Sequence, residues 1–118
     1  MAYIDCFVLP VPKKNLDAYR REARKAGKVW MKHGALQYIE CLADDVQAGK
    51  HTSFPQSVKL KDGEVVVFSY AIYKSRKHRD SVMAKVMKDP LMTNMDPASM
   101  PFDGKRMFWG GFKPFISL

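Results

Sequence analysis

The chain has 118 residues, of which 47% are hydrophobic and 27% charged, and it carries a net charge of +8 at pH 7. This length predicts one domain, residues 1–118, and the composition excludes a disordered chain or a fibre. No apolar run approaches the roughly 20 residues of a membrane helix, so we expect no membrane partner. The first six residues carry no basic side chain. We therefore expect no secretory signal and a cytoplasmic location.

The first expected strand covers residues 3–9, which are rich in aromatic and β-branched side chains, and it ends at Pro10 and Pro12. Asn15 is a suitable N-cap for a helix that continues to about Lys32. At about 100° per residue, the apolar positions of this helix fall on one stripe. The stripe consists of Leu16, Tyr19, Ala23, Ala26 and Trp30.

The middle of the chain holds two more expected strands. Gly34 separates the helix from a strand over residues 35–42, and a polar loop covers residues 43–57. The Asp62–Gly63 pair predicts a turn before a strand over residues 64–73. Because this strand is apolar on both faces, we expect it in the centre of a sheet.

The last part of the chain begins with a second expected helix. Ser75 is its N-cap, and the helix continues to about Asp89, where Pro90 ends it. An irregular segment over residues 91–104 leads to a final strand over residues 106–112. Two consecutive glycines in this strand predict a bulge or a close backbone approach.

The expected order of elements is β-α-β-β-α-β. This order predicts an α+β, ferredoxin-like domain, in which two helices cover one face of a four-stranded antiparallel sheet. The other face would expose many apolar side chains, and such a patch usually marks an interface. A homodimer that packs sheet against sheet would cover it, so we expect a dimeric α/β barrel.

Four segments resemble a known family. They lie at residues 28–35 (KVWMKHGA), 63–70 (GEVVVFSY), 75–80 (SRKHRD) and 100–112 (MPFDGKRMFWGGF). Together they are similar to the YbaA-like bacterial family, a domain family of unknown function, over almost the whole chain. The resemblance implies the dimeric α/β-barrel superfamily, which also contains cofactor-free monooxygenases. Fold alone transfers no activity, so a monooxygenase-like role is an analogy only.

Arg79 is the most informative charged residue, because it projects into the middle of the apolar arc of the second expected helix. A guanidinium that faces the sheet needs an anionic partner, since an unpaired buried charge is very costly. Asp5 and Glu40 are the strand carboxylates that would pair with it. The alternative is that Arg79 holds the carboxylate or enolate of a small ligand between helix and sheet.

His33 lies at the C-terminal end of the first expected helix, where it would bond the terminal carbonyls or act as a general base at the rim of a pocket. A cofactor-free oxygenase needs a dry aromatic cavity beside such a base. The same side chains would also make an ordinary core. The candidates for the cavity are Trp30, His33, Tyr38, Phe68 and Trp109.

We expect neither a metal nor another cofactor. His33, His51 and His78 lack the spacing of metal ligands, and no glycine-rich phosphate loop follows a strand. Cys6 and Cys41 form no metal motif or disulfide framework, and two small buried thiols in a reducing compartment are the simplest interpretation.

A basic face lies opposite the apolar stripe of the first helix. Five like charges on one exposed face can follow a phosphate backbone, although a solvated helix face has the same pattern. No aromatic residue interleaves these cations except Trp30, which points the other way, so nucleic acid is an alternative that the sequence does not favour. The face consists of Arg21, Arg24, Lys25, Lys28 and Lys32.

The first functional hypothesis is a cytoplasmic homodimer that binds or transforms a small anionic or aromatic molecule between sheet and helices. Arg79 would anchor the anion and His33 would be the base. The second hypothesis is a protein that binds RNA or another polyanion through the basic face, without chemistry. A third is an accessory protein whose partner is another protein.

Overall fold

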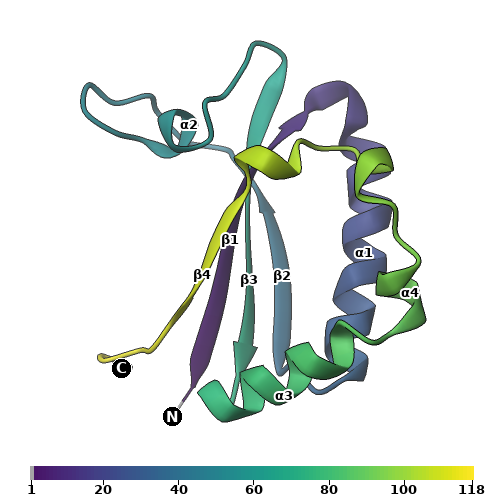
Figure 1. Cartoon of the computed structure of the whole chain (residues 1–118). Helices are drawn as coiled ribbons and strands as arrows, with labels where there is room; N and C mark the ends of the chain where they lie inside the picture. The colour runs from purple at the N-terminus through teal and green to yellow at the C-terminus, as the bar shows by residue number, and fades with distance from the viewer. Residues whose placement is uncertain (1) are drawn as a thin grey trace.

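The computed structural model describes residues 2–118, and within them four strands form one antiparallel sheet (Figure 1). The strands lie in the order β2-β3-β1-β4, with β3 in the centre as expected. This order and the chain sequence βαββαβ are those of the ferredoxin-like fold, so the predicted α+β class is confirmed. The strands are β1 (Tyr3–Pro12), β2 (Gln37–Leu42), β3 (Glu64–Tyr73) and β4 (Phe108–Phe112).

The helices α1 (Leu16–Lys32) and α3 (Arg76–Val86) cover one face of the sheet, and the short α4 (Pro90–Thr93) lies beside α1 (Figure 1). A segment with the one-turn helix α2 (Phe54–Ser57) projects on the other side. None of the helices described in residues 2–118 is long and apolar enough to cross a membrane. The shorter 3₁₀ turns are η1 (Lys13–Asn15), η2 (Pro97–Ser99) and η3 (Gly104–Arg106).

The first strand is longer than the sequence predicts, because β1 continues through both prolines. The backbone N–H of Lys13 bonds the carbonyl of Gly63 on the β3 side. N–H groups alternate along a strand, so those that Pro10 and Pro12 lack would point to the β4 side. The pairing of β4 with β1 ends at Val8, so no hydrogen bond is lost there.

The second helix ends earlier than the sequence predicts, at Val86. Ser75 caps it as expected, and its hydroxyl accepts a hydrogen bond from the backbone N–H of His78. Asp89 then caps the next helix, since its Oδ1 accepts the N–H of Leu91. Pro90 begins α4 rather than simply ending α3, which agrees with the preference of proline for the first turn.

The two glycines of β4 form no bulge, and at Gly111 the backbone passes close to the ring of Tyr3. The register of β4 against β1 is continuous from Val8 opposite Phe108 to Ile4 opposite Phe112. A Cβ atom on Gly111 would lie 2.7 Å from Cε2 of Tyr3. Glycine is therefore needed at this position to let the tyrosine ring cross the strand.

The sheet has a helix-facing side and an open side, because side chains alternate along each strand. Residues around Val58 pack on Val8 and Val66 at one end of the open side. Within the described residues, no helix covers the rest of that side (Figure 1). Six helix-facing residues are Asp5, Phe7, Leu9, Tyr38, Glu40 and Ser69. Six residues of the open side are Cys6, Val8, Cys41, Phe68, Tyr70 and Ile72.

Candidate functional site

Asp5 and Arg79 form a buried ion pair between β1 and α3. Nη1 of Arg79 lies 2.8 Å from Oδ1 of Asp5, and the two side chains are 12% and 2% exposed. The same guanidinium donates to Asp80 at 2.9 Å and to the hydroxyl of Tyr3 at 3.4 Å. Burial raises the pKa of Asp5 above its ordinary value, although Arg79 acts in the opposite direction. Of the two carboxylates proposed for Arg79, Asp5 is its partner.

Glu40 on β2 is held by two tyrosines. The hydroxyl of Tyr19 donates to its Oε1 at 2.7 Å, and the hydroxyl of Tyr38 donates to its Oε2 at 2.6 Å. Tyr19 comes from the apolar stripe of α1, whereas Tyr38 lies two residues before Glu40 on the same side of β2. Burial, followed by the Glu40 carboxylate, raises the pKa of both phenols, so they remain protonated and donate.

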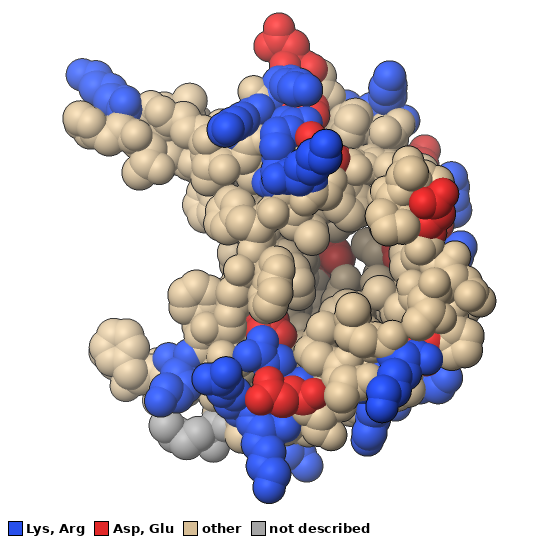
Figure 2. Space-filling model, in the orientation of Figure 1, with Lys and Arg blue, Asp and Glu red and all other residues tan. Residues whose placement is uncertain are grey.

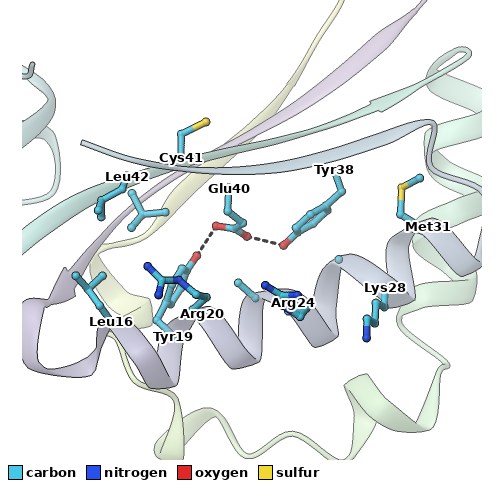
Figure 3. A pocket seen from close by; sticks show the side chains of 13 residues that line it. Leu16, Tyr19, Arg20, Arg24, Lys28, Met31, Tyr38, Glu40, Cys41 and Leu42 are labelled. Carbon is cyan, nitrogen blue, oxygen red and sulfur yellow. Dashed lines mark hydrogen bonds between the residues drawn. The ribbon is translucent and has the colours of Figure 1, made fainter. Parts of the chain in front are cut away.

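Glu40 and its tyrosines separate two hollows. A groove of about 570 Å³ lies between α1 and β2 (Figure 3). A cavity of about 320 Å³ lies deeper, between the sheet, α1 and the segment 92–107. Figure 2 shows a hollow in the middle of the molecule, with acidic atoms at its bottom. Tyr19, Ala23, Tyr38 and Glu40 line both the groove and the cavity.

The wall of the deep cavity is rich in aromatic rings and methionines. Trp30 is buried, donates from Nε1 to the hydroxyl of Tyr73 at 3.0 Å, and lies 5.7 Å from the Tyr38 ring between centroids. Flexible thioethers adapt to ligands of different shape, and aromatic rings offer flat apolar surface. The remaining apolar lining includes Phe7, Leu9, Met92, Met95, Met100, Phe102 and Met107.

His33 lies outside both hollows. It follows the last turn of α1, and its Nε2 lies 2.7 Å from Oδ2 of Asp89. Lys32 contacts the same oxygen at 3.3 Å. The hydrogen bond from His33 and that from the backbone of Leu91 lower the pKa of Asp89. This cluster ties the end of α1 to the start of α4.

The expectation that five side chains line one cavity is wrong for Phe68. Phe68 pairs with Cys41 on the open side of the sheet, and its ring packs near Phe54 and Tyr70. Trp109 is exposed at the β4 edge and stacks on Phe7 at 6.3 Å between ring centroids. Only Trp30 and Tyr38 of the five line the deep cavity.

The basic face of α1 divides into two parts. Arg24 and Lys28 line the groove together with Arg20, whereas Arg21, Lys25 and Lys32 do not. Lys25 pairs with Glu22 at 3.4 Å and Lys32 with Asp89 at 3.3 Å. The five cations therefore do not form one free surface.

The structure also adds sites that sequence reasoning missed. Tyr19 appeared only as a member of an apolar stripe, and its hydroxyl gave no separate signal. Arg106 binds both oxygens of Glu64, at 2.8 and 2.7 Å, and donates from Nε to Asp103 at 2.9 Å. This arginine fastens the segment before β4 to the start of β3. In residues 2–118, no group of three His, Cys, Asp or Glu side chains is placed to hold a metal ion.

Comparison with known proteins places the sequence in a family. The model of "Protein of unknown function (DUF1428)" matches residues 2–104. The chain is 47% identical over 116 residues to "Uncharacterized protein YbaA" of Escherichia coli K12, covering 98% of each chain. The Shigella flexneri protein of the same name gives the same identity and coverage.

Solved structures with similar folds share little sequence with the chain. SnoaB, a cofactor-independent oxygenase from Streptomyces nogalater, gives a TM-score of 0.57 at 12% identity over 99% of this chain and 96% of its own. A NIPSNAP domain protein from Burkholderia xenovorans gives 0.56 at 11% identity, covering 98% of each chain. A dimeric ferredoxin-like protein from an uncultured marine organism gives 0.55 at 12% identity over both full chains. At these identities the likeness concerns the fold alone.

Proposed function

Because the chain belongs to the DUF1428 family of proteins of unknown function, we propose a function from its own geometry: a homodimer that binds a small, largely apolar molecule beside Glu40. The ligand lies between the sheet and α1. It carries a hydrogen-bond donor, such as a hydroxyl group, which points at the Glu40 carboxylate. The pocket lies between the sheet and a helix, as the sequence predicts, but the residue proposed to contact the ligand is Glu40 instead of Arg79 or His33.

The proposal rests on the hydrogen bonds of Glu40 and on its lack of a cationic partner among the described residues. A carboxylate accepts about four hydrogen bonds, and the two tyrosines supply one on each oxygen. Within residues 2–118, no lysine or arginine forms an ion pair with Glu40. The acid therefore keeps capacity for another donor at the wall of a cavity, where a hydrogen bond to a charged group is strong.

In this proposal Glu40 contacts the ligand in place of Arg79 and His33, as a hydrogen-bond acceptor and not as an anchor for an anion. Arg79 is hydrogen-bonded to Asp5, Asp80 and Tyr3, and His33 is hydrogen-bonded to Asp89. Neither side chain lines the groove or the cavity. Glu40 is thus the acceptor for the ligand, and its position would also suit a general base.

The open side of the sheet supports the homodimer. Phe108 and Phe112 of β4 are exposed, and Cys6, Ile39 and Ile72 on neighbouring strands are half-buried. A contiguous apolar face of this kind usually marks an interface, and a two-fold dimer covers the same face on both copies. A structural neighbour described as dimeric supports the same assembly. Native mass spectrometry tests it, and a monomer at micromolar concentration would contradict it.

The binding test compares two probes that differ in one donor, 2-naphthol and 2-methoxynaphthalene, by equilibrium dialysis. We expect 2-naphthol to bind the wild-type protein more tightly. Glu40→Gln should weaken 2-naphthol about tenfold and leave the methoxy compound unchanged, because a hydrogen bond to a charged group is worth about 1.5–3 kcal/mol. Gln keeps one acceptor oxygen for one tyrosine, and its amide N–H can donate to the hydroxyl oxygen of the other, so the fold should persist.

Asp17→Asn is the matched control, since Asp17 is an exposed acid on α1 whose loss changes the net charge equally. It should change neither affinity. Equal binding of the two probes, or a Glu40→Gln protein that binds 2-naphthol as the wild type does, would refute the assignment to Glu40.

A further inference from the structure

We propose that the groove between α1 and β2 holds an anionic group of the same ligand at Arg20, Arg24 and Lys28, which makes the ligand a hydroxylated aromatic carboxylate. This inference rests on the proposed function, because Glu40 receives the hydroxyl group. It adds the second end of the ligand and therefore its chemical class.

The three cations form one row along α1. They are four residues apart, so they lie above one another on successive turns and span about 12 Å. All three line the groove, and Figure 3 shows them along the helix beside Glu40 and its two tyrosines. A row of this length accommodates a carboxylate at more than one position next to the apolar wall.

The row is poorly neutralised by the protein itself. Arg20 approaches Asp17 at 3.7 Å, and both side chains are largely exposed. Within residues 2–118, no acid lies within ion-pair distance of Arg24 or Lys28. A surface pair such as Arg20–Asp17 contributes little, so acids of the protein neutralise the row only weakly.

The groove has cations at its rim, formed by the row on α1, and an acid at its floor, and these opposite charges determine which ligand fits. Leu16, Met31, Leu42 and Val67 give the groove apolar walls, and the ring of Tyr38 adds a flat surface. The floor carries the anionic Glu40, which repels an anion and attracts a hydroxyl group. A molecule that satisfies both ends has a carboxylate at the rim, an aromatic body along the walls and a hydroxyl group at the floor.

A nucleic-acid strand fits this surface less well than a small anion. Lys25 and Lys32, on the outer part of the helix, are paired with acids. A strand that used Arg24 and Lys28 would also bring phosphates towards Glu40. The groove therefore favours a single carboxylate over a chain of phosphates, and the test below includes the strand as an outcome.

The test uses isothermal titration calorimetry with 6-hydroxy-2-naphthoate and 2-naphthol, which share the ring and the hydroxyl group and differ in the carboxylate. Arg24→Gln and Arg21→Gln are matched variants, because each removes one charge from α1 but only Arg24 lines the groove. We expect Arg24→Gln to weaken the naphthoate about fivefold and to leave 2-naphthol unchanged, while Arg21→Gln changes neither. The affinity for the naphthoate should also fall as salt increases.

Four outcomes would overturn the inference. If the two probes bind equally, or Arg21→Gln acts like Arg24→Gln, the row does not hold the carboxylate; the proposed function survives as long as 2-naphthol still depends on Glu40. If an RNA oligonucleotide binds more tightly than the naphthoate, with equal losses in both variants, the surface serves polyanions. If neither probe binds at about 1 mM, the proposed function fails as well.

Discussion

Asp5 and Glu40 are both acids on the helix-facing side of the same sheet, and the structure treats them in opposite ways. Asp5 is 2% exposed in its side chain and is neutralised by Arg79 at 2.8 Å. Glu40 is half-buried, its carboxylate accepts hydrogen bonds from the hydroxyls of Tyr19 and Tyr38, and it lies against two hollows. The sequence offered both acids as partners of Arg79, and Asp5 is the one that pairs with it.

The difference shows how the fold satisfies one acid within the protein, which we call a closed site, and leaves another acid able to accept a further donor, which we call an open site. A guanidinium satisfies the charge of Asp5 and, with Tyr3 beside it, fills the space around that acid. Tyrosine hydroxyls bond Glu40 without cancelling its charge. The first arrangement stabilises the contact between α3 and β1, whereas the second keeps an anionic acceptor at the wall of a cavity.

The largest expected effect separates the two acids by stability. Arg79→Met should lower the free energy of unfolding by about 3 kcal/mol, because it leaves Asp5 buried without its cation. Glu40→Gln should lower it by less than about 1 kcal/mol, since the amide still bonds the tyrosines. Urea denaturation followed by circular dichroism measures both.

Arg76→Met is the control for this comparison, because Arg76 lies on the same helix with a side chain that is 72% exposed. Its effect should stay within about 0.5 kcal/mol. If Glu40→Gln destabilises the protein as much as Arg79→Met does, Glu40 is a structural acid, and the contrast between a closed and an open site is wrong.

Sequence pattern was sufficient for the fold and for the burial of Arg79, but it did not choose between Asp5 and Glu40. Both acids lie on the same side of the sheet, so the alternation of side chains does not distinguish them. The choice depends on where α3 crosses the sheet, and Arg79 near the start of α3 reaches Asp5 and Tyr3 on β1. That placement is a tertiary property of the whole domain.

The error at Phe68 has a related cause. β3 is apolar on both sides, so its hydrophobic pattern does not say which side packs on α1. The connection between β2 and β3 is long, and no tight turn fixes the register of that pair from the sequence. The pairing of His33 with Asp89, 56 residues away, was likewise beyond local pattern.

A smaller effect is expected at Gly27, where α1 passes under Tyr38. A Cβ atom on this glycine would lie 2.8 Å from Cδ1 of Tyr38 and 3.0 Å from Cε1, so Gly27→Ala must displace the ring. The displaced hydroxyl would no longer bond Glu40 at its present distance of 2.6 Å. We expect 2-naphthol to bind about threefold more weakly, as for the weakening of one hydrogen bond.

Stability separates this effect from a general loss of structure. Alanine in place of glycine favours a helix by about 1 kcal/mol, which offsets the cost of moving the ring. The free energy of unfolding should therefore change little while the affinity falls. An unchanged affinity would show that the position of Tyr38 is unimportant for the ligand, and Tyr38→Phe would then be expected to bind like the wild type.

The smallest expected effect concerns a second closed site, at the other end of β3, where Arg106 binds both oxygens of Glu64. These hydrogen bonds lower the pKa of Glu64 below its ordinary value of 4.5 in the folded protein. The folded state then binds fewer protons than the unfolded state as the pH falls below that value. The stability that the pair contributes is complete above it and is lost as the pH falls through the lowered pKa.

Glu64→Gln and Arg106→Gln should both make the free energy of unfolding less dependent on pH as the pH falls below 4.5, the ordinary pKa of Glu64. Urea titrations at several pH values measure this slope. Arg106→Gln should reduce the slope more than Glu64→Gln, because it also removes the hydrogen bond that lowers the pKa of Asp103. If the curves of the wild type and both variants run parallel, the pair contributes no acid sensitivity. In that case, pairing with an arginine would distinguish Glu64 from Glu40 by its contacts and would not make the stability of the fold depend on pH.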